Sequence, residues 1–231
     1  MQIIVIAAQK GGAGKTTLAL HLAVEYQRAG KSVALIDTDP QRSAEMWGGL
    51  RDAQDITVVG VPGAEIAAAL RDAESDGYDV VLVDTPPHAS AALVPVLRLA
   101  TLAVVPFQPS PLDLGTLETV RRMLDAAGTP AVAVINAAPL RAAEVEPMRQ
   151  AIEEGGLPVL ETVVHHLMPF RRSIGNGLSV VEFDPKGRGA FEIKKLRKDI
   201  DAAIAALPAA TPVAARSANK LTTYPRNYVT R

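Results

Sequence analysis

Short runs of Val, Ile and Ala recur along this 231-residue chain, and each is apolar throughout rather than at alternate positions. Strands show this pattern when helices cover both faces of a parallel sheet. The segments between the runs carry Ala, Leu, Glu and Arg at helical spacing. We therefore predict an α/β fold of the doubly wound kind, a mostly parallel sheet with helices on both faces. The predicted strands are residues 3–7, 32–36, 56–59, 80–83, 102–106 and 131–135, and the predicted helices are residues 16–29, 64–73, 113–127 and 142–154.

A glycine-rich segment joins the first predicted strand to the first predicted helix. Its second half matches a phosphate-binding loop, although Gly11 replaces the first glycine of the usual spacing. Glycines let backbone N–H groups surround a phosphate, and the helix N-terminus adds its dipole. Lys15 would bridge β- and γ-phosphates, Thr16 would bind Mg²⁺ and Thr17 would contact the α-phosphate. The order of strand, loop and helix favours a P-loop NTPase over a plain glycine-rich turn. The segment reads Lys10-Gly11-Gly12-Ala13-Gly14-Lys15-Thr16-Thr17.

Acidic side chains stand at the ends of two other predicted strands. Asp37 and Asp39 follow the second strand, and Asp84 follows the fourth. Ligands of open parallel sheets bind beyond the carboxyl ends of the strands, so these side chains should converge on the glycine-rich segment. We predict that Asp84 is a direct or indirect Mg²⁺ partner, and that Asp39 belongs to the same metal site and orients the attacking water. Asp37 fits a metal site and a helix cap equally well.

The composition excludes several classes of protein. The chain has no cysteine, which excludes disulfides, zinc–thiolate sites and cysteine-ligated iron–sulfur clusters. The apolar N-terminus lacks the basic leader of a signal peptide, and no apolar run approaches the roughly 20 residues that span a bilayer. We therefore expect a soluble, cytoplasmic protein. Residues 1–207 form the predicted domain, and residues 208–231 are a predicted basic, flexible tail.

Several motifs in order along the chain resemble the ParA/MinD family of ATPases with a deviant Walker A box. Lys10 stands where that family has its signature lysine, which reaches the partner's phosphates in an ATP-dependent homodimer. The resemblance also implies that Asn136, Asp184 and Pro185 approach the adenine base of ATP. It covers about residues 1–205. The motifs are Lys-Gly-Gly-x-Gly-Lys-Thr-Thr from Lys10, Asp37-Thr38-Asp39-Pro40-Gln41, Asp84-Thr85-Pro86-Pro87, Ser110-Pro111-Leu112-Asp113 and Val181-Glu182-Phe183-Asp184-Pro185-Lys186.

The charge of the chain is unevenly distributed although its net value is −1. Residues 1–170 hold 12 basic and 20 acidic side chains, whereas residues 171–198 hold eight basic and three acidic ones. Such a basic segment suits phosphate contacts that bind double-stranded DNA without reading its sequence. An ordinary solvated helix face would give a similar pattern. The candidate DNA contacts are Arg171, Arg172, Lys186, Arg188, Lys194, Lys195, Arg197 and Lys198.

The resemblance implies a small ParA-type protein, nucleoid-associated, whose slow ATP hydrolysis is stimulated by a ParB-like or other cargo adaptor. Two other functions stay open. One is a membrane-surface positioning ATPase like MinD. Residues 208–231 give this function little support, because they lack the sustained apolar face of a membrane-binding helix. The other is an ATP-dependent metabolic synthase on the same loop scaffold. The cargo itself, whether plasmid, chromosome, protein cluster or microcompartment, is not encoded in any motif.

Overall fold

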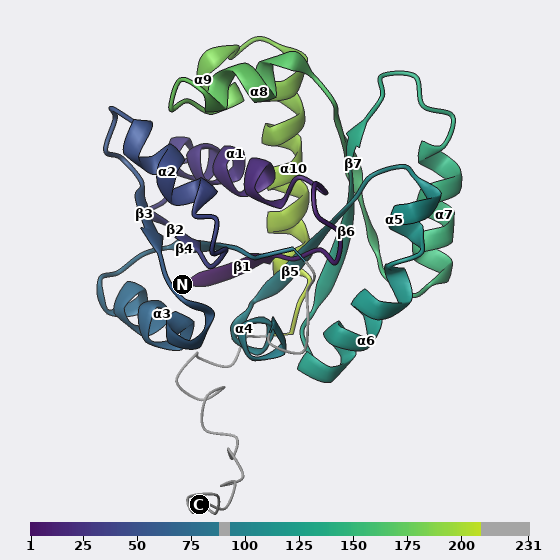
Figure 1. The fold of residues 1–231 in the computed structure, drawn as a ribbon, viewed down its shortest axis with the longest axis horizontal. Coiled ribbons are helices and arrows are strands. Elements are labelled where there is room, and N and C mark those ends of the chain that lie inside the picture. The colour runs from purple at the N-terminus through teal and green to yellow at the C-terminus, as the bar shows by residue number, and fades with distance from the viewer. Residues whose placement is uncertain (88–92, 209–231) are drawn as a thin grey trace, which may run out of the picture.

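The computed structural model describes residues 1–87 and 93–208, and these form a seven-stranded, all-parallel sheet (Figure 1). The strand order is β3-β2-β4-β1-β5-β6-β7, so the strand that leads into the glycine-rich segment lies at the centre. The predicted fold class is confirmed. The strands are β1 (Gln2–Ile6), β2 (Val33–Asp37), β3 (Thr57–Gly60), β4 (Val80–Asp84), β5 (Leu102–Phe107), β6 (Ala131–Ala138) and β7 (Val159–His165).

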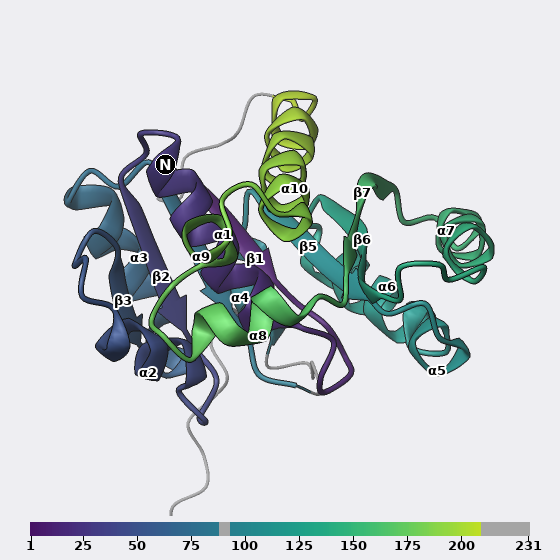
Figure 2. The same cartoon turned by 90° about the horizontal axis from the view of Figure 1, so that it is seen from above.

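Helices cover both faces of the sheet. Helices α1, α2, α8, α9 and α10 pack on one face, and α3, α4, α6 and α7 pack on the other. Figure 2, which looks down on the first face, shows α8, α9 and α10 beside α1. The helices are α1 (Lys15–Arg28), α2 (Ser43–Leu50), η1 (Gly63–Glu65, a 3₁₀ turn), α3 (Ile66–Ser75), α4 (Val94–Leu99), α5 (Pro111–Leu114), α6 (Leu117–Ala127), α7 (Val145–Glu154), α8 (Met168–Ile174), α9 (Val180–Phe183) and α10 (Arg188–Ala205).

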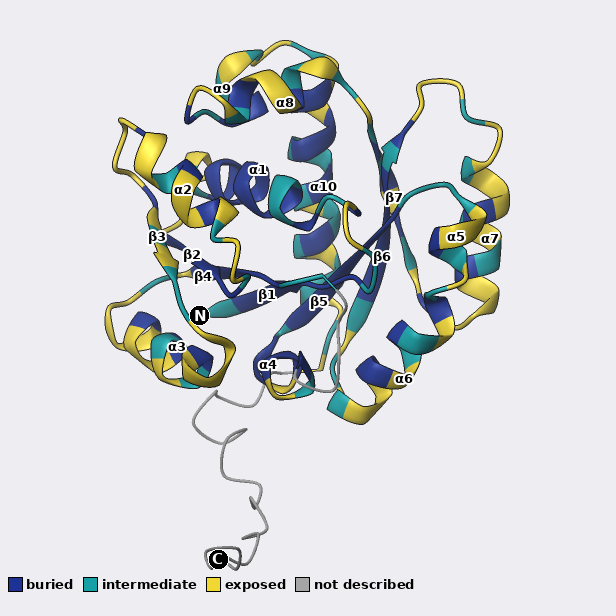
Figure 3. Ribbon diagram, viewed as in Figure 1, coloured by how far each residue is buried: buried dark blue, intermediate teal, exposed yellow. Residues whose placement is uncertain are grey.

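The two helical layers explain why the apolar runs are continuous. Along β1, Ile3 and Val5 enter the core on the α3 side, whereas Ile4 and Ile6 enter the core on the α1 side. Successive side chains of a strand point to opposite faces, so a strand covered on both faces needs apolar residues at every position. Figure 3 shows the central strands buried along their length.

One strand was not predicted, and it lies at the edge of the sheet. Strand β7 alternates between buried and exposed residues, because only one of its faces is fully covered. Carboxylates of α10 accept hydrogen bonds from its backbone: Asp199 Oδ2 accepts from Thr162 N (2.9 Å) and Glu192 Oε2 accepts from His165 N (2.9 Å). This pairing satisfies donors that an edge strand otherwise offers to another chain.

A buried polar network ties α1 and the end of α2 to α9, at the start of the basic C-terminal part. Arg51, just after α2, makes bidentate contacts with Glu182 of α9, at 2.8 and 2.9 Å. From α1, the fully buried His21 accepts a hydrogen bond from Val180 N through Nδ1 (3.1 Å), and burial lowers the pKa of His21 to about 3. These contacts fix α9 against the helix that follows the glycine-rich segment.

Among residues 1–87 and 93–208, no helix combines the length and apolar character needed to cross a bilayer. Helix α10 ends at Ala205, close to the predicted domain boundary at residue 207. The predicted flexible tail lies almost wholly outside the described residues, of which Pro208 is the last. Its state stays a prediction.

Candidate functional site

The glycine-rich segment forms a turn between the centre of the sheet and the N-terminus of α1. Gly12 and Gly14 adopt positive φ angles of 78° and 88°, which side chains with a Cβ rarely tolerate. A Cβ on Gly14 would also lie 2.3 Å from Asn136 Nδ2. Helix α1 begins at Lys15, so the free N–H groups of its first turn face the end of this loop. The backbone therefore has the shape and the donors of an anion-binding site.

Two side-chain amides hold the loop from the sheet side. Asn136 Nδ2 donates to Ala13 O (2.7 Å), and Gln108 Nε2 donates to Gly12 O (2.9 Å). Gln108 was not among the predicted residues, although it directly follows β5 at the carboxyl end of the sheet, where ligands of such folds bind. Contact of Asn136 with an adenine base stays a prediction, because the structure gives its amide nitrogen a different partner.

A cleft of about 290 Å³ opens in front of the loop. Lys15 is almost fully buried there, with 6% of its surface exposed. Burial lowers the pKa of Lys15, and the nearby carboxylates of Asp84 and Asp39 oppose this effect. A buried ammonium held between carboxylates is ready to pair with phosphate oxygens. The cleft is lined by Gly11, Gly12, Gly14, Lys15, Thr16, Thr17, Asp39 and Pro87.

Thr16 and Asp84 meet at one side of this cleft. Thr16 Oγ1 donates to Asp84 Oδ2 (2.6 Å), while Asp84 Oδ1 is buried without a hydrogen-bond partner. Burial raises the pKa of Asp84 to about 7, and the hydrogen bond from Thr16 opposes this shift. An unpartnered carboxylate oxygen beside a hydroxyl matches the all-oxygen ligand sets that Mg²⁺ prefers. These two residues would hold Mg²⁺, directly or through water, and the metal would neutralise phosphate charge.

The two carboxylates after β2 have different surroundings. Asp37 is fully buried, and its oxygens accept hydrogen bonds from Asp39 N (2.9 Å) and from Ala44 N (2.9 Å) at the start of α2. Of the two interpretations of Asp37, the structure therefore favours the helix cap. Asp39 accepts one hydrogen bond, from Gln41 N (2.9 Å), and lines the cleft. Asp39 remains available for water.

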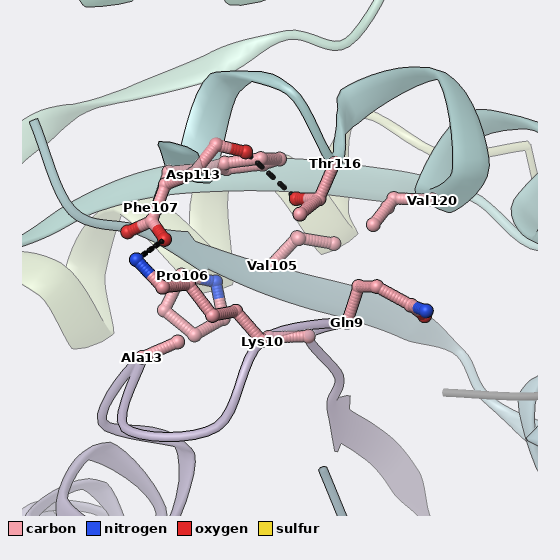
Figure 4. A pocket seen from close by; sticks show the side chains of 10 residues that line it. Gln9, Lys10, Ala13, Val105, Pro106, Phe107, Asp113, Thr116 and Val120 are labelled. Atoms are coloured by element: carbon pink, nitrogen blue, oxygen red, sulfur yellow. Dashed lines mark hydrogen bonds and ion pairs between the residues drawn. The ribbon is translucent and has the colours of Figure 1, made fainter. Parts of the chain in front are cut away.

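Lys10 lies beside the cleft and pairs with a carboxylate of its own chain. Lys10 Nζ is 2.8 Å from Asp113 Oδ1, and Asp113 is 2% exposed (Figure 4). Asp113 Oδ2 also accepts from Gln108 N (2.8 Å), which fixes the carboxylate at the end of β5. The predicted reach of Lys10 to a partner's phosphates requires that this ion pair open first.

The remaining predicted residues lie farther along the chain. Asp184 and Pro185 stand in the turn between α9 and α10 and do not line the described cleft. Their contact with adenine stays a prediction. The eight basic candidates lie on α8, on α10 and in the turn before α10, on the same face of the sheet as α1.

The raised pKa of Asp84 predicts how the stability of the ligand-free protein depends on pH. Asp84 keeps its proton up to about pH 7 when folded but loses it near pH 4 when unfolded, so the free energy of unfolding falls as the pH rises between these values. We expect Asp84→Asn to remove this loss and to raise the free energy of unfolding at about pH 8 by on the order of 2 kcal/mol. Urea titrations without Mg²⁺ measure the effect, with the exposed Asp72→Asn on α3 as control. A wild-type stability that does not fall over this pH range would contradict it.

Comparison with known proteins supplies the family. Residues 4–181 match the model of the CobQ/CobB/MinD/ParA nucleotide binding domain. The chain belongs to this family. The ParA/MinD resemblance is thus confirmed, and so are ATP and Mg²⁺ as the cofactors of the family.

Two solved structures and one relative show how far the likeness to the CobQ/CobB/MinD/ParA family extends. "Maintenance of carboxysome distribution protein A" of Halothiobacillus neapolitanus is 30% identical over 207 residues, which are 85% of this chain and 95% of the relative. MinD complexed with Mg-ADP, from Pyrococcus horikoshii, aligns with a TM-score of 0.73 at 19% identity, over 87% of this chain and 96% of that one. Cobyrinic acid a,c-diamide synthase from Mycobacterium smegmatis, with an ATP analogue and magnesium, aligns with a TM-score of 0.72 at 19% identity, over 86% and 93%. The last two show the fold alone.

Proposed function

We propose that this chain is a ParA-type ATPase that binds Mg-ATP, dimerises around the nucleotide, binds DNA without sequence preference and positions a DNA or protein cargo. The observation that carries the proposal is the convergence of Lys15, Thr16, Asp84 and Asp39 on one cleft, beside a loop that carries Lys10. The likeness to a distribution protein over 85% of this chain supports positioning as the task.

ATP would act in this protein as a switch. Lys15 and the N–H groups at the start of α1 bind phosphates, and Lys10 adds a contact that exists only between two protomers. Loss of the γ-phosphate removes that contact and weakens the dimer. Asp39 would orient the attacking water, and a cargo adaptor would accelerate the slow hydrolysis. The expected location is the cytoplasm, on the nucleoid.

The pairing of basic side chains divides the candidate DNA contacts into two groups. Three are engaged in ion pairs: Arg188 with Glu192 (2.7 Å), Lys195 with Glu161 (3.0 Å), and Arg197 with Glu25 and Asp201. The others have no acidic partner within 4.0 Å in the described part of the chain, so their charge is available to phosphates. These are Arg171, Arg172, Lys186, Lys194 and Lys198.

Removing both arginines of α8 tests DNA binding. We expect the double variant Arg171→Ala/Arg172→Ala, with Mg-ATP, to bind duplex DNA about tenfold more weakly, because each arginine neutralises one phosphate. The slope of log affinity against log salt should fall in magnitude by roughly 2. Biolayer interferometry on immobilised duplex DNA at several salt concentrations measures both. The matched control is Arg71→Ala/Arg122→Ala, on helices α3 and α6 of the opposite face.

The wild-type protein and the double variant also distinguish the two alternative functions, a membrane-surface ATPase and a metabolic synthase. If the double variant binds DNA like the control while the wild-type protein floats with anionic liposomes in ATP, the membrane-surface ATPase is the better assignment. ATP turnover that depends on a small carboxylate substrate, and persists after Lys10→Ala, would indicate a synthase instead.

A further inference from the structure

Two consecutive carbonyl groups of the glycine-rich loop are turned towards the sheet by side chains. Gln108, one residue after β5, donates to Gly12 O, and Asn136, in β6, donates to Ala13 O. Strands β5 and β6 are neighbours in the sheet. The two amides therefore form a bracket, by which we mean Gln108 and Asn136 together, behind the loop.

The pleat of the strands explains why both amides face the loop. Val104 and Val134 point into the core on the α1 side. Gln108 lies four residues after Val104, just beyond the end of β5, and Asn136 lies two residues after Val134 in β6. Residues two or four apart share a face of a sheet. The register of β6 against β7 shifts beyond Ile135, which lets the chain turn there while Asn136 stays 4% exposed. Both amides are thus placed by the sheet rather than by a loose loop.

The bracket fixes the direction of the loop's donors. The C=O of one residue and the N–H of the next share a planar trans peptide and point in opposite directions. Holding Gly12 O and Ala13 O towards the sheet therefore directs the N–H groups of Ala13 and Gly14 away from it. Among the described residues, neither of these N–H groups donates to another atom of the chain. Free, aligned backbone N–H groups form an anion-binding nest.

We propose that Gln108 and Asn136 are positioning residues that pre-form the phosphate nest, so that both provide affinity for the phosphate chain itself. The inference rests on the proposed nucleotide-binding function. It gives Gln108 a role, and it gives Asn136 a role through Nδ2 that leaves Oδ1 able to contact adenine as well. Gly14 belongs to the same device, because any Cβ there would collide with the Asn136 amide.

Comparing ATP with a ligand that has no base tests the inference. ATP and inorganic tripolyphosphate, each with Mg²⁺, displace a fluorescent ATP analogue from the full chain. We expect Asn136→Ala and Gln108→Ala each to weaken tripolyphosphate about tenfold and ATP by at least the same factor, since each variant releases one loop carbonyl. Matched controls are Asn176→Ala, two residues after α8, and Gln150→Ala, on α7; these amides donate to Arg172 O and Glu154 Oε1, away from the cleft.

The outcomes separate the two roles. If Asn136→Ala weakens ATP but leaves tripolyphosphate unchanged, Asn136 acts on the base alone and the inference is overturned. Unchanged affinity for both ligands in either variant also overturns it. Thermal unfolding of each variant without ligand separates lost affinity from lost structure. If Asn136→Ala does not fold, Gln108→Ala still tests the inference, because Gln108 is only half-buried. A wild-type chain that binds neither ligand would instead refute the proposed function.

Discussion

Lys15→Ala is expected to weaken the binding of Mg-ATP by roughly a thousandfold, the largest loss of affinity among single substitutions at this site. Lys15 is 6% exposed, and the carboxylates of Asp84 and Asp39 favour its charged form. Its ammonium is the buried cation that lines the cleft, so a triphosphate entering the variant would meet the two carboxylates without a compensating charge. The loss therefore includes repulsion as well as a missing contact.

Isothermal titration of Mg-ATP measures this loss, and the thermal shift on adding ATP should vanish with it, because stabilisation by a ligand depends on its dissociation constant. The exposed Lys31→Ala, just beyond α1, is the control for removal of a lysine. Binding of ATP to Lys15→Ala within tenfold of wild type would show that another cation holds the phosphates.

The sequence was sufficient to predict the sheet and the loop because both depend on local pattern. Strands β1, β2, β4 and β5 are apolar apart from a single polar residue at one end of β1, β2 and β4, as burial on two faces requires. Strand β7 was missed because its alternation is typical of an edge strand, and its pairing depends on Asp199 and Glu192 of a helix more than 25 residues later. Helices α2, α8 and α9 have at most eight residues, too few for a helical period to be recognised.

Residue types predicted the site's chemistry, but not which of its atoms already form hydrogen bonds or ion pairs within the chain. The sequence left Asp37 open between a metal site and a helix cap, whereas the structure shows that its oxygens cap α2 and that Asp39 faces the cleft. Likewise, Lys10 is identifiable by its place in the loop, whereas its ion pair with Asp113 joins segments about 100 residues apart. Such contacts follow from the strand order and from the direction of each side chain, which only the folded chain fixes.

The difference between Asp37 and Asp39 leads to the second large effect. Among the described residues, the Asp39 carboxylate accepts a single hydrogen bond, from Gln41 N, so replacing it by alanine removes little support from the fold. Lys15, Thr16 and Asp84 keep their positions, and ATP should still bind. If Asp39 orients the attacking water, its removal should slow hydrolysis by about a hundredfold or more, which is what a positioned acid–base group contributes to a rate. The variant should accumulate in its ATP-bound state.

We therefore expect Asp39→Ala to bind ATP like the wild-type chain, to hydrolyse it about a hundredfold more slowly even with the adaptor present, and to remain dimeric on DNA after the wild type has dissociated. Phosphate release, light scattering of the dimer and retention on duplex DNA measure the three properties. The matched control is Asp76→Ala, an exposed carboxylate at the end of α3 on the opposite face of the sheet. Fully active, adaptor-stimulated hydrolysis by Asp39→Ala would contradict the role given to this carboxylate. Loss of ATP binding would do so as well, because it would place Asp39 in the support of the cleft rather than in the chemical step.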